Sequence, residues 1–186
     1  MGSEMCIRDS GKNEIVLANK NGRAIRFDES DIREMGRVST GVRGMRLDEG
    51  DDEIIGMVCV NDPMTETIMV VSEKGYGKRS LVDDYRKTGR GAKGVRNLGI
   101  TDKTGRVVAI KIVTDDNDLM IINKSGIIIR MKVAEVRTMG RGAQGVRLIN
   151  LTKKNDIIAS VCKVMTSEEE EEVEAENAAE MPEDAQ

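Results

Sequence analysis

The chain carries the sequence RKTGRGAKGVR at residues 86–96, and close copies of it stand at two other places. These copies are REMGRVSTGVR at residues 33–43 and RTMGRGAQGVR at residues 137–147, and all three share the pattern R-x-x-G-R-x-x-x-G-V-R. Successive copies are offset by 53 and 51 residues. Self-similarity at a nearly fixed period is the signature of a repeat architecture, so we interpret the chain as three copies of one unit.

Each unit is predicted to hold four short strands rich in Ile and Val, which suit half-buried pleated surfaces. The predicted strands are 14–18, 23–27, 42–47 and 54–60 in the first unit, 67–72, 77–82, 95–100 and 107–113 in the second, and 119–123, 127–133, 146–151 and 157–164 in the third. The last strand of each unit is apolar on both faces, which predicts burial between neighbouring sheets.

A four-stranded unit of about 50 residues has the period of a propeller blade. The predicted fold is therefore all-β and propeller-like, with three four-stranded blades that form a partial ring, because a closed propeller needs roughly four to eight blades. The chain either oligomerises or belongs to a longer array, and we favour the longer array. The predicted boundaries are 1–10 for a disordered leader unrelated to the repeats, 11–64, 65–116 and 117–164 for the blades, and 165–186 for a disordered acidic tail.

The net charge of −4 hides two segments of opposite sign. From Glu168 to the end there are ten acidic residues and no Lys or Arg, so the rest of the chain carries 29 basic residues against 23 acidic ones, or +6. A basic body favours an anionic partner. A run of glutamates repels itself and cannot pack, which is typical of a solvated extension.

The composition excludes several classes of site. The chain has no His, which excludes His-based acid–base catalysis and a Cys/His zinc site. Cys6, Cys59 and Cys162 show no CxxC spacing and fit a reducing compartment. We place Cys59 and Cys162 at the repeat position of Ile112, which predicts that both are small core hydrophobes. No apolar run approaches about 18 residues, so no membrane-spanning helix is expected, and residues 1–10 are not a secretory signal.

The loop between the second and third predicted strands of each unit concentrates Arg, Lys and Gly. Glycine lets the backbone approach a ligand closely, and backbone N–H groups beside guanidinium groups suit phosphate oxygens. One such loop per blade places the charges along one edge of the stacked blades. Duplex DNA carries one charge per roughly 1.7 Å of axis, so a regular row of cations matches its backbone without reading bases. The sequence therefore predicts salt-dependent binding of duplex DNA.

The predicted DNA-binding residues are cations of these loops and of the segment after Gly75: Arg33, Arg37, Arg43, Arg46, Lys78, Arg79, Arg86, Lys87, Arg90, Lys93, Arg96, Arg137, Arg141 and Arg147. The alternative is that the loops are solvated turns whose arginines pair with nearby carboxylates. The candidate carboxylates are Asp31, Asp83, Asp84 and Glu135. The scarcity of aromatic residues argues against single-stranded nucleic acid, which binds to stacking platforms.

No catalytic residue, metal site or cofactor is predicted in this segment. Residues 89–94 lack the G-x-x-x-x-G-K-[ST] pattern of a phosphate-binding loop. No nucleophile–base pair can be assembled without His. A non-enzymatic propeller-like platform, on which the Arg loops meet acidic proteins, stays open as an alternative function.

At these loops the sequence closely resembles the C-terminal domain of the A subunit of bacterial DNA gyrase, over residues 12–164. The resemblance rests on residues 41–47 (GVRGMRL), residues 75–79 (GYGKR) and the three Gly-Arg loops, together with an acidic tail. It implies a six-bladed β-pinwheel, a propeller-like disc with altered strand pairing, around whose basic rim DNA bends. The three units are similar to its last three blades.

The resemblance also implies a mechanism and partners. In that family the disc wraps DNA with positive handedness and presents it to the cleavage gate of the same type II topoisomerase. Strand passage, driven by ATP with magnesium in the holoenzyme, then introduces negative supercoils. The catalytic tyrosine lies in another part of the gyrase A chain, so Tyr76 and Tyr85 are not that nucleophile. The implied partners are duplex DNA, the rest of gyrase A, and gyrase B in a heterotetramer, in the bacterial cytoplasm at the nucleoid.

Two features bear on the subtype and on regulation. The gyrase-specific box Gln-Arg-Arg-Gly-Gly-Lys-Gly of the first blade is not present, and residues 88–94 match it only at Arg90, Gly91, Lys93 and Gly94. This departure leaves room for the related subunit of topoisomerase IV, whereas the repeat loops and the acidic terminus favour gyrase. The tail is either a solubilising extension or a segment that competes with DNA for the basic rim.

Overall fold

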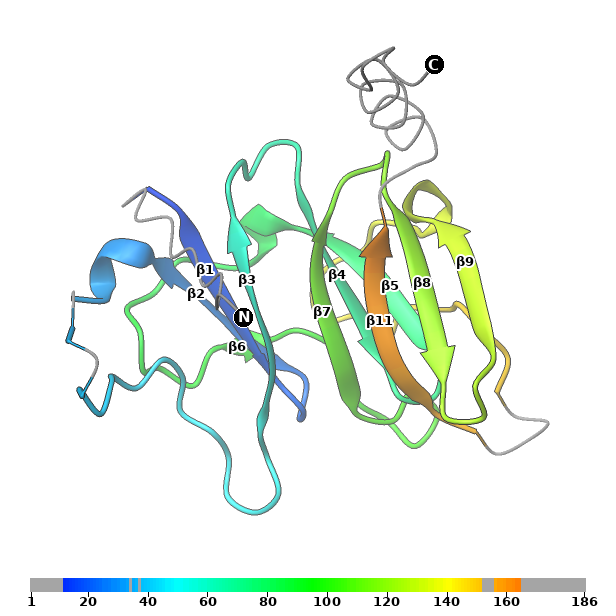
Figure 1. Ribbon diagram of the computed structural model, residues 1–186, viewed down its shortest axis with the longest axis horizontal. Helices are drawn as coiled ribbons and strands as arrows, with labels where there is room; N and C mark the ends of the chain where they lie inside the picture. The colour runs from blue at the N-terminus through cyan, green and yellow to red at the C-terminus, as the bar shows by residue number, and fades with distance from the viewer. Residues whose placement is uncertain (1–11, 34, 37, 152–155, 165–186) are drawn as a thin grey trace, which may run out of the picture.

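The computed structural model describes residues 12–33, 35–36, 38–151 and 156–164 (Figure 1). The strands are β1 (Glu14–Asn19), β2 (Arg23–Asp28), β3 (Ile54–Val60), β4 (Thr67–Ser72), β5 (Tyr76–Leu81), β6 (Val95–Arg96), β7 (Val107–Val113), β8 (Asp118–Asn123), β9 (Ile128–Lys132), β10 (Val146–Arg147) and β11 (Ile158–Val164). Short 3-10 helices follow the second strand of each unit: η1 (Glu29–Asp31), η2 (Val82–Asp84) and η3 (Val133–Glu135). The predicted all-β fold is confirmed. The predicted leader and acidic tail lie outside the described residues.

The described strands form two four-stranded sheets and one three-stranded sheet, in the orders β3-β1-β2-β6, β10-β5-β4-β7 and β11-β8-β9. The fourth strand of each four-stranded sheet comes from the following unit. In the first sheet Arg96 of β6 pairs with Arg23 of β2, and in the second Arg147 of β10 pairs with Tyr76 of β5. Each of these two joints is therefore closed by backbone hydrogen bonds as well as by side-chain packing.

The predicted strand at residues 42–47 is wrong, because residues 41–48 adopt no regular secondary structure. Its sequence matches that of β6 and β10, but those strands pair with the second strand of the preceding unit. No unit precedes the first one among the described residues, so this segment has no strand to pair with. A short strand is not stable without a partner. The predicted strands at 95–100 and 146–151 shorten to two residues each, because only two residues of each pair with the preceding unit.

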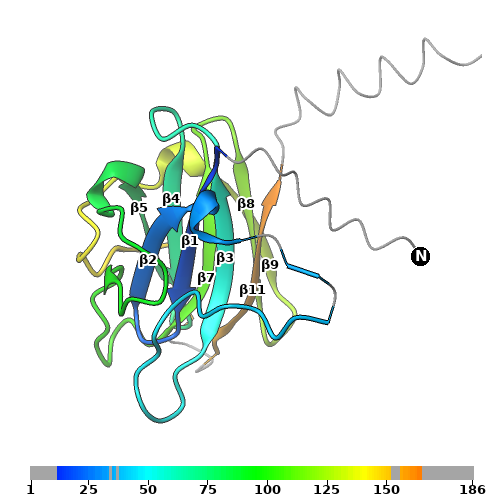
Figure 2. The ribbon, with the colours of Figure 1, turned by 90° about the vertical axis from the view of Figure 1, so that its left-hand side faces the viewer.

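Two apolar cores lie between successive sheets, which follow one another in chain order across the molecule (Figures 1 and 2). Between the first two sheets, Val16 and Val60 pack with Ile68, Val70 and Ile110. Between the second and third, the core is formed by Met69, Val71, Ala109, Val113, Leu119, Ile121, Ile158 and Val161 together with Val133 and Val136 after β9. Full burial of one such side chain contributes about 1.5–3 kcal/mol, so these cores hold the units together.

Strand β7 contacts both β3 and β11, so its predicted burial between sheets is confirmed (Figure 1). The same prediction is wrong for β3 and β11, which belong to the two outer sheets and have a neighbouring sheet on one face only. On the other face of β3, Met57 is 61% exposed and Cys59 is also exposed.

The prediction that Cys59 and Cys162 are core residues is wrong, because both are exposed. Cys59 lies on the outer face of the first sheet. Cys162 is paired with Met120, whereas Lys111 is paired with Met69 at the equivalent place in the second sheet. Cys162 therefore takes the register position of Lys111 rather than of Ile112, and it faces away from the second sheet.

Candidate nucleic-acid interface

The repeated Arg–Gly segments form three loops, the first of which is described except for residues 34 and 37. Loop 1 is residues 33–46, loop 2 is residues 86–96 and loop 3 is residues 137–147; together we call them the loop row. Loop 2 begins after η2 and ends in β6, which pairs with β2 of the first unit. Loop 3 begins after η3 and ends in β10, which pairs with β5 of the second unit. Loops 2 and 3 thus lie beside the sheet of the preceding unit.

Successive loops contact one another through the same hydrogen bond. The guanidinium of Arg90 in loop 2 donates to the main-chain oxygen of Arg43 in loop 1 at 3.3 Å. The guanidinium of Arg141 in loop 3 donates to the main-chain oxygen of Arg96 in loop 2 at 3.1 Å. In both pairs the donor is the Arg of Gly-Arg and the acceptor is the Arg of Gly-Val-Arg. The three loops are therefore linked in chain order into one continuous surface.

Glycine before Val-Arg is required by the close approach of each loop to the preceding unit. Gly94 and Gly145 have φ of +73° and +83°, and a Cβ on either one would overlap the main-chain oxygen of Ala24 or Gly77. The equivalent Gly41 has φ of +79° with nothing within 4 Å of a Cβ. Its backbone keeps the conformation of the repeat although no described unit lies against it.

Most of the predicted DNA-binding cations are on the surface. The exposed ones are Arg33, Arg43, Arg46, Arg86, Lys87, Arg90, Lys93, Arg96, Arg137 and Arg147, and Arg141 is half-buried. Arg37 lies outside the described residues. Two of the exposed cations form ion pairs: Lys87 with Glu14 at 2.6 Å and Asp28 at 3.1 Å, and Lys93 with Asp48 at 2.5 Å. Within the described part of the chain the exposed arginines of the loop row form no ion pair. Ion pairs with nearby carboxylates therefore engage only Lys87 and Lys93 among the described exposed cations, and the exposed arginines can still bind an anion.

The structure contradicts the prediction for Lys78 and Arg79, which are buried at the joint between the second and third units. Lys78 is 0% exposed and Arg79 is 8% exposed. The Arg79 Nε donates to the main-chain oxygen of Val136 at 2.8 Å, and its guanidinium also pairs with Asp115. Arg79 thus binds the third unit to the second. Its charge looked available in the sequence, because nothing in a single sequence distinguishes an exposed arginine from one that bridges two units.

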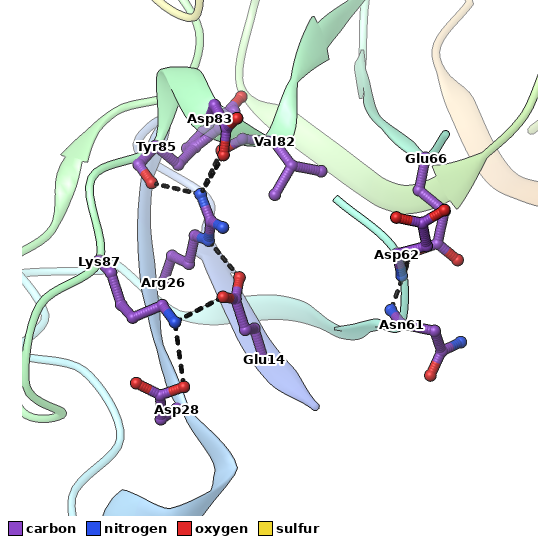
Figure 3. Close-up of polar contacts among 10 residues, drawn as sticks. All are labelled: Glu14, Arg26, Asp28, Asn61, Asp62, Glu66, Val82, Asp83, Tyr85 and Lys87. Atoms are coloured by element: carbon purple, nitrogen blue, oxygen red, sulfur yellow. Dashed lines mark hydrogen bonds and ion pairs between the residues drawn. The ribbon is translucent and has the colours of Figure 1, made fainter. Parts of the chain in front are cut away.

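Arg26 makes the equivalent bridge between the first two units (Figure 3). Its guanidinium donates to the main-chain oxygens of Val82 at 2.9 Å and Tyr85 at 3.1 Å, and it pairs with Glu14 and, at 3.3 Å, with Asp83. Asp83 is therefore engaged by a bridging arginine and not by a cation of the loop row.

Glu14 sits at the centre of this joint, where it contacts both Arg26 and Lys87 (Figure 3). Burial of Glu14 opposes its ionisation, but the hydrogen bonds from Arg26 and Lys87 outweigh that cost and lower the pKa of Glu14. The carboxylate is thus held ionised between two cations, and it fixes the start of loop 2 against β1 and β2.

Two residues beside the loop row were missed in the sequence. The Tyr76 hydroxyl accepts a hydrogen bond from Arg147 at 3.1 Å, which lowers the pKa of Tyr76. The Lys103 Nζ lies 5.4 Å from the centre of the Tyr76 ring, and the Arg147 guanidinium lies 5.7 Å from it. Tyr76 therefore orients the last arginine of loop 3. No pattern in the sequence connects Tyr76 with Arg147. Their contact follows from the pairing of β10 with β5.

An open depression lies where loops 2 and 3 meet, lined by Asp84, Arg96, Gly140, Arg141, Gly142 and Ala143. Two guanidinium groups and a run of main-chain groups border it, which is chemistry suited to a phosphate group. Over the described ranges no group of three or more metal-ligating side chains gathers in one place. Helices long and apolar enough to cross a membrane are likewise absent from the described part of the chain.

The fold and this surface define a class: an all-β, propeller-like repeat protein whose units share a continuous basic edge. The sequence model of the family described as DNA gyrase C-terminal domain, beta-propeller, matches residues 13–61, 66–114 and 117–162. The chain belongs to this family.

Individual relatives agree with this assignment. The chain is 43% identical over 162 residues to the DNA gyrase A subunit of Staphylococcus aureus (strain MRSA252), a match that covers 87% of this chain and 18% of the relative. Among solved structures it is similar to a DNA gyrase A C-terminal domain, with a TM-score of 0.75 and 30% identity over 83% of this chain and 51% of the other. It is also similar to the C-terminal domain of DNA topoisomerase IV, with a TM-score of 0.77 and 28% identity over 83% of this chain and 47% of the other. The chain thus spans less than a fifth of the curated relatives and about half of these solved domains.

Proposed function

We propose that this chain is the part of a DNA gyrase A protein that binds and bends duplex DNA along the loop row. The observation that carries the proposal is the continuity of the row: a guanidinium–carbonyl hydrogen bond joins each loop to the one before it, and exposed arginines occur on every loop. A rigid row of cations neutralises successive phosphates and guides the path of the duplex. The contacts are to the backbone, so binding is strongly dependent on salt and weakly dependent on sequence.

The residues proposed to contact DNA are the surface cations of the loop row, with Lys78 and Arg79 removed from the set. They are Arg33, Arg43, Arg46, Arg86, Lys87, Arg90, Lys93, Arg96, Arg137, Arg141 and Arg147. Arg37 is retained from the repeat pattern alone. Lys87 and Lys93 exchange carboxylate partners for phosphates, so they contribute less than the unpaired arginines.

The remaining parts of the proposal concern the complete enzyme. The bent DNA is presented to the cleavage gate of a type II topoisomerase, in which ATP and magnesium act on the gyrase B partner and negative supercoils result. This segment supplies no catalytic residue or cofactor ligand to that reaction. The assembly is a heterotetramer of gyrase A, to which this segment belongs, and gyrase B, in the bacterial cytoplasm at the nucleoid. The equivalent domain of topoisomerase IV is the second candidate, supported by the structural similarity to that domain.

The test is binding of the full chain to duplex DNA of a few hundred base pairs across a salt series, followed by relaxation of circular DNA in its presence. A steep loss of affinity with salt and a change in the linking number of the relaxed circles are expected. Weak binding without a salt slope would defeat the DNA function and favour a platform for acidic proteins.

A matched pair of double variants places the interaction on the loop row. Arg86→Glu with Arg137→Glu reverses two exposed cations at the same repeat position in loops 2 and 3. Lys124→Glu with Lys163→Glu makes the same change in charge on exposed residues outside the loop row. The first double variant is expected to lose most of the affinity, and the second to lose little. Equal losses would mean that net charge alone governs binding.

A further inference from the structure

The second unit contains a set of buried polar side chains with no counterpart in the other two units. Lys78 and Ser80 of β5, Tyr85 after η2 and Asn97 after β6 are each 0% exposed. The equivalent residues of the first unit are Ile25, Phe27, Ile32 and Gly44, and those of the third are Ile129, Met131, Val136 and Leu148. Residues without polar side chains therefore occupy these positions in the other two units, so the repeat itself does not require polar ones.

These side chains form a buried polar network between loop 2 and loop 3. The Tyr85 hydroxyl donates to Asn97 Oδ1 at 2.5 Å. Ser80 is close enough to Tyr85 to lower the pKa of its hydroxyl, against the larger effect of burial. The Lys78 Nζ donates to Ser80 Oγ at 2.7 Å and to the main-chain oxygen of Gly140 at 3.2 Å.

Ser80 adds a second connection to loop 3, because its Oγ donates to the main-chain oxygen of Met139 at 2.8 Å. The network thus begins at Asn97, directly after Arg96 at the end of loop 2, and it ends at Met139 and Gly140, directly before Arg141 in loop 3.

A buried ammonium group is costly unless it is well hydrogen-bonded, and isoleucine stands at the same position in both sister units. We propose that Lys78 is a positioning residue that, through Ser80 and Gly140, holds Arg141 of loop 3 at a fixed place beside Arg96 of loop 2. The Arg141–Arg96 hydrogen bond and the depression that these two arginines border lie directly outside the network. The ligand of this depression is a phosphate group of the DNA backbone. That assignment rests on the proposed function, whereas the positioning role does not.

The positioning contact is sensitive to pH in the mildly alkaline range. Burial lowers the pKa of Lys78 to about 8, with Asp84 raising it and Arg141 lowering it. Tyr85 is the other titratable group of the network, and burial raises its pKa, so it keeps its proton. The facing residues of β4, Ile68 and Val70, are apolar. Lys78 therefore carries its charge at neutral pH and loses it near pH 8, which weakens its hold on Gly140.

The first experiment follows the backbone amide signals of the full chain by NMR between pH 6.5 and 9.5, without DNA. In the wild type the amides of Gly140 and Arg141 are expected to titrate with a midpoint near 8, and in Lys78→Met this titration is expected to vanish. Lys111→Met, a half-buried lysine of β7, is the matched control and is expected to leave it unchanged. Gly140 and Arg141 amide signals that neither titrate in the wild type nor shift in Lys78→Met at fixed pH overturn the proposal.

A second variant keeps the test decisive if Lys78→Met does not fold. Ser80→Ala removes one acceptor from the ammonium group and is expected to move the midpoint to lower pH. An unchanged midpoint overturns the proposal.

The DNA arm measures the affinity of the wild type and of Lys78→Met for duplex DNA at pH 7 and pH 9. The wild type is expected to lose several-fold more affinity than Lys78→Met over this interval. Equal pH dependence overturns the link between Lys78 and DNA binding. Loss of all DNA binding with an intact Gly140 titration would defeat the proposed function and leave the positioning role standing.

Discussion

The guanidinium of Arg141 donates a hydrogen bond to the main-chain oxygen of Arg96 at 3.1 Å, so a cation of one unit is anchored on the loop of the unit before it. Arg90 is anchored on Arg43 in the same way one unit earlier. A side chain in this arrangement presents part of its guanidinium to the protein and part to solvent. The loop row is thereby pre-ordered, and DNA meets cations whose spacing is already set, which reduces the entropy lost on binding.

Two replacements of Arg141 distinguish the contribution of its charge to DNA affinity from that of its hydrogen bond to Arg96. Arg141→Ala removes both, and we expect several-fold weaker DNA binding and a salt slope smaller by about one. Arg141→Lys keeps the charge and loses the planar guanidinium, so the salt slope is expected to persist while affinity falls less. Both are measured by fluorescence anisotropy with labelled duplex across a salt series. An unchanged slope in Arg141→Ala would show that this arginine does not contact a phosphate.

The repeated glycine before Val-Arg offers a test in which the chain supplies its own control. Gly94→Ala and Gly145→Ala place a Cβ against the main-chain oxygen of Ala24 or Gly77, whereas Gly41→Ala meets nothing within 4 Å. All three share the strain of a positive φ, about 1–3 kcal/mol. We expect Gly94→Ala and Gly145→Ala to lower the free energy of unfolding by at least about 2 kcal/mol more than Gly41→Ala, as measured by urea titration. Similar losses for all three would contradict the close approach of loops 2 and 3 to the preceding unit.

The sequence predicted the strands that depend on local pattern, because those strands pair within their own unit. Residues 67–72 and 107–113 coincide with β4 and β7. It failed at residues 42–47, because a strand there depends on a partner in another unit. The pattern Gly-Val-Arg is the same in all three loops, but it becomes a strand only in the two that lie against a second strand.

The exposed cations of the candidate site were predicted from the sequence, whereas the buried residues beneath them were not. Repetition showed which loops carry cations, since charge and glycine recur in the sequence itself. It could not show that Lys78 and Arg79 point inward, because burial depends on which unit packs against β5. The exposure of Cys59 has the same origin, since an outer sheet lacks a neighbour on one face. In each case the missing information was the contact between units.

Arg26 and Arg130, which occupy the same repeat position, are expected to differ in their contribution to stability. Arg26 is buried with Glu14, so Arg26→Met leaves a buried carboxylate without its main partner and is expected to cost about 3–5 kcal/mol. Arg130 occupies the same repeat position in the third unit and pairs with Asp118, but its side chain is 41% exposed. Arg130→Met also leaves the buried carboxylate of Asp118 without this partner, but the Arg130 guanidinium is partly exposed and screened by solvent, so we expect a smaller cost of about 1–3 kcal/mol. Chemical denaturation of both variants measures the two costs, and a cost below about 1 kcal/mol for Arg26→Met would show that the joint between the first two units does not depend on Arg26.

The ion pairs of Glu14 should make the free energy of unfolding depend on pH in the acidic range. The pKa of Glu14 in the folded chain lies below the ordinary value of 4.5, so its contribution is complete above 4.5 and is lost as the pH falls through the folded-state pKa. The difference in unfolding free energy between the wild type and Glu14→Gln should therefore be largest near neutral pH and shrink below pH 4.5. Asp62→Asn, in an exposed loop, is the comparison, because hydrogen bonds from Thr65 and Met64 lower the pKa of Asp62 without a cation. Its difference is expected to shrink in acid as well but to be insensitive to added salt, whereas the difference for Glu14→Gln is reduced by salt. If the difference in unfolding free energy between the wild type and Glu14→Gln stays constant below pH 4.5, the ion pairs of Glu14 do not stabilise the fold.

The acidic tail gives a last prediction, which concerns residues outside the described part of the structure. The body carries +6 and the segment from Glu168 onward carries ten acidic residues, so the two attract one another most strongly at low salt. If the tail competes with DNA for the loop row, truncation after Ser167 should raise DNA affinity at 50 mM salt and have little effect at 300 mM. A full-length chain with the tail glutamates changed to glutamine should behave like the truncated one, since it keeps the length and removes the charge. Equal affinity of all three chains at low salt would leave the tail with a solubilising role only.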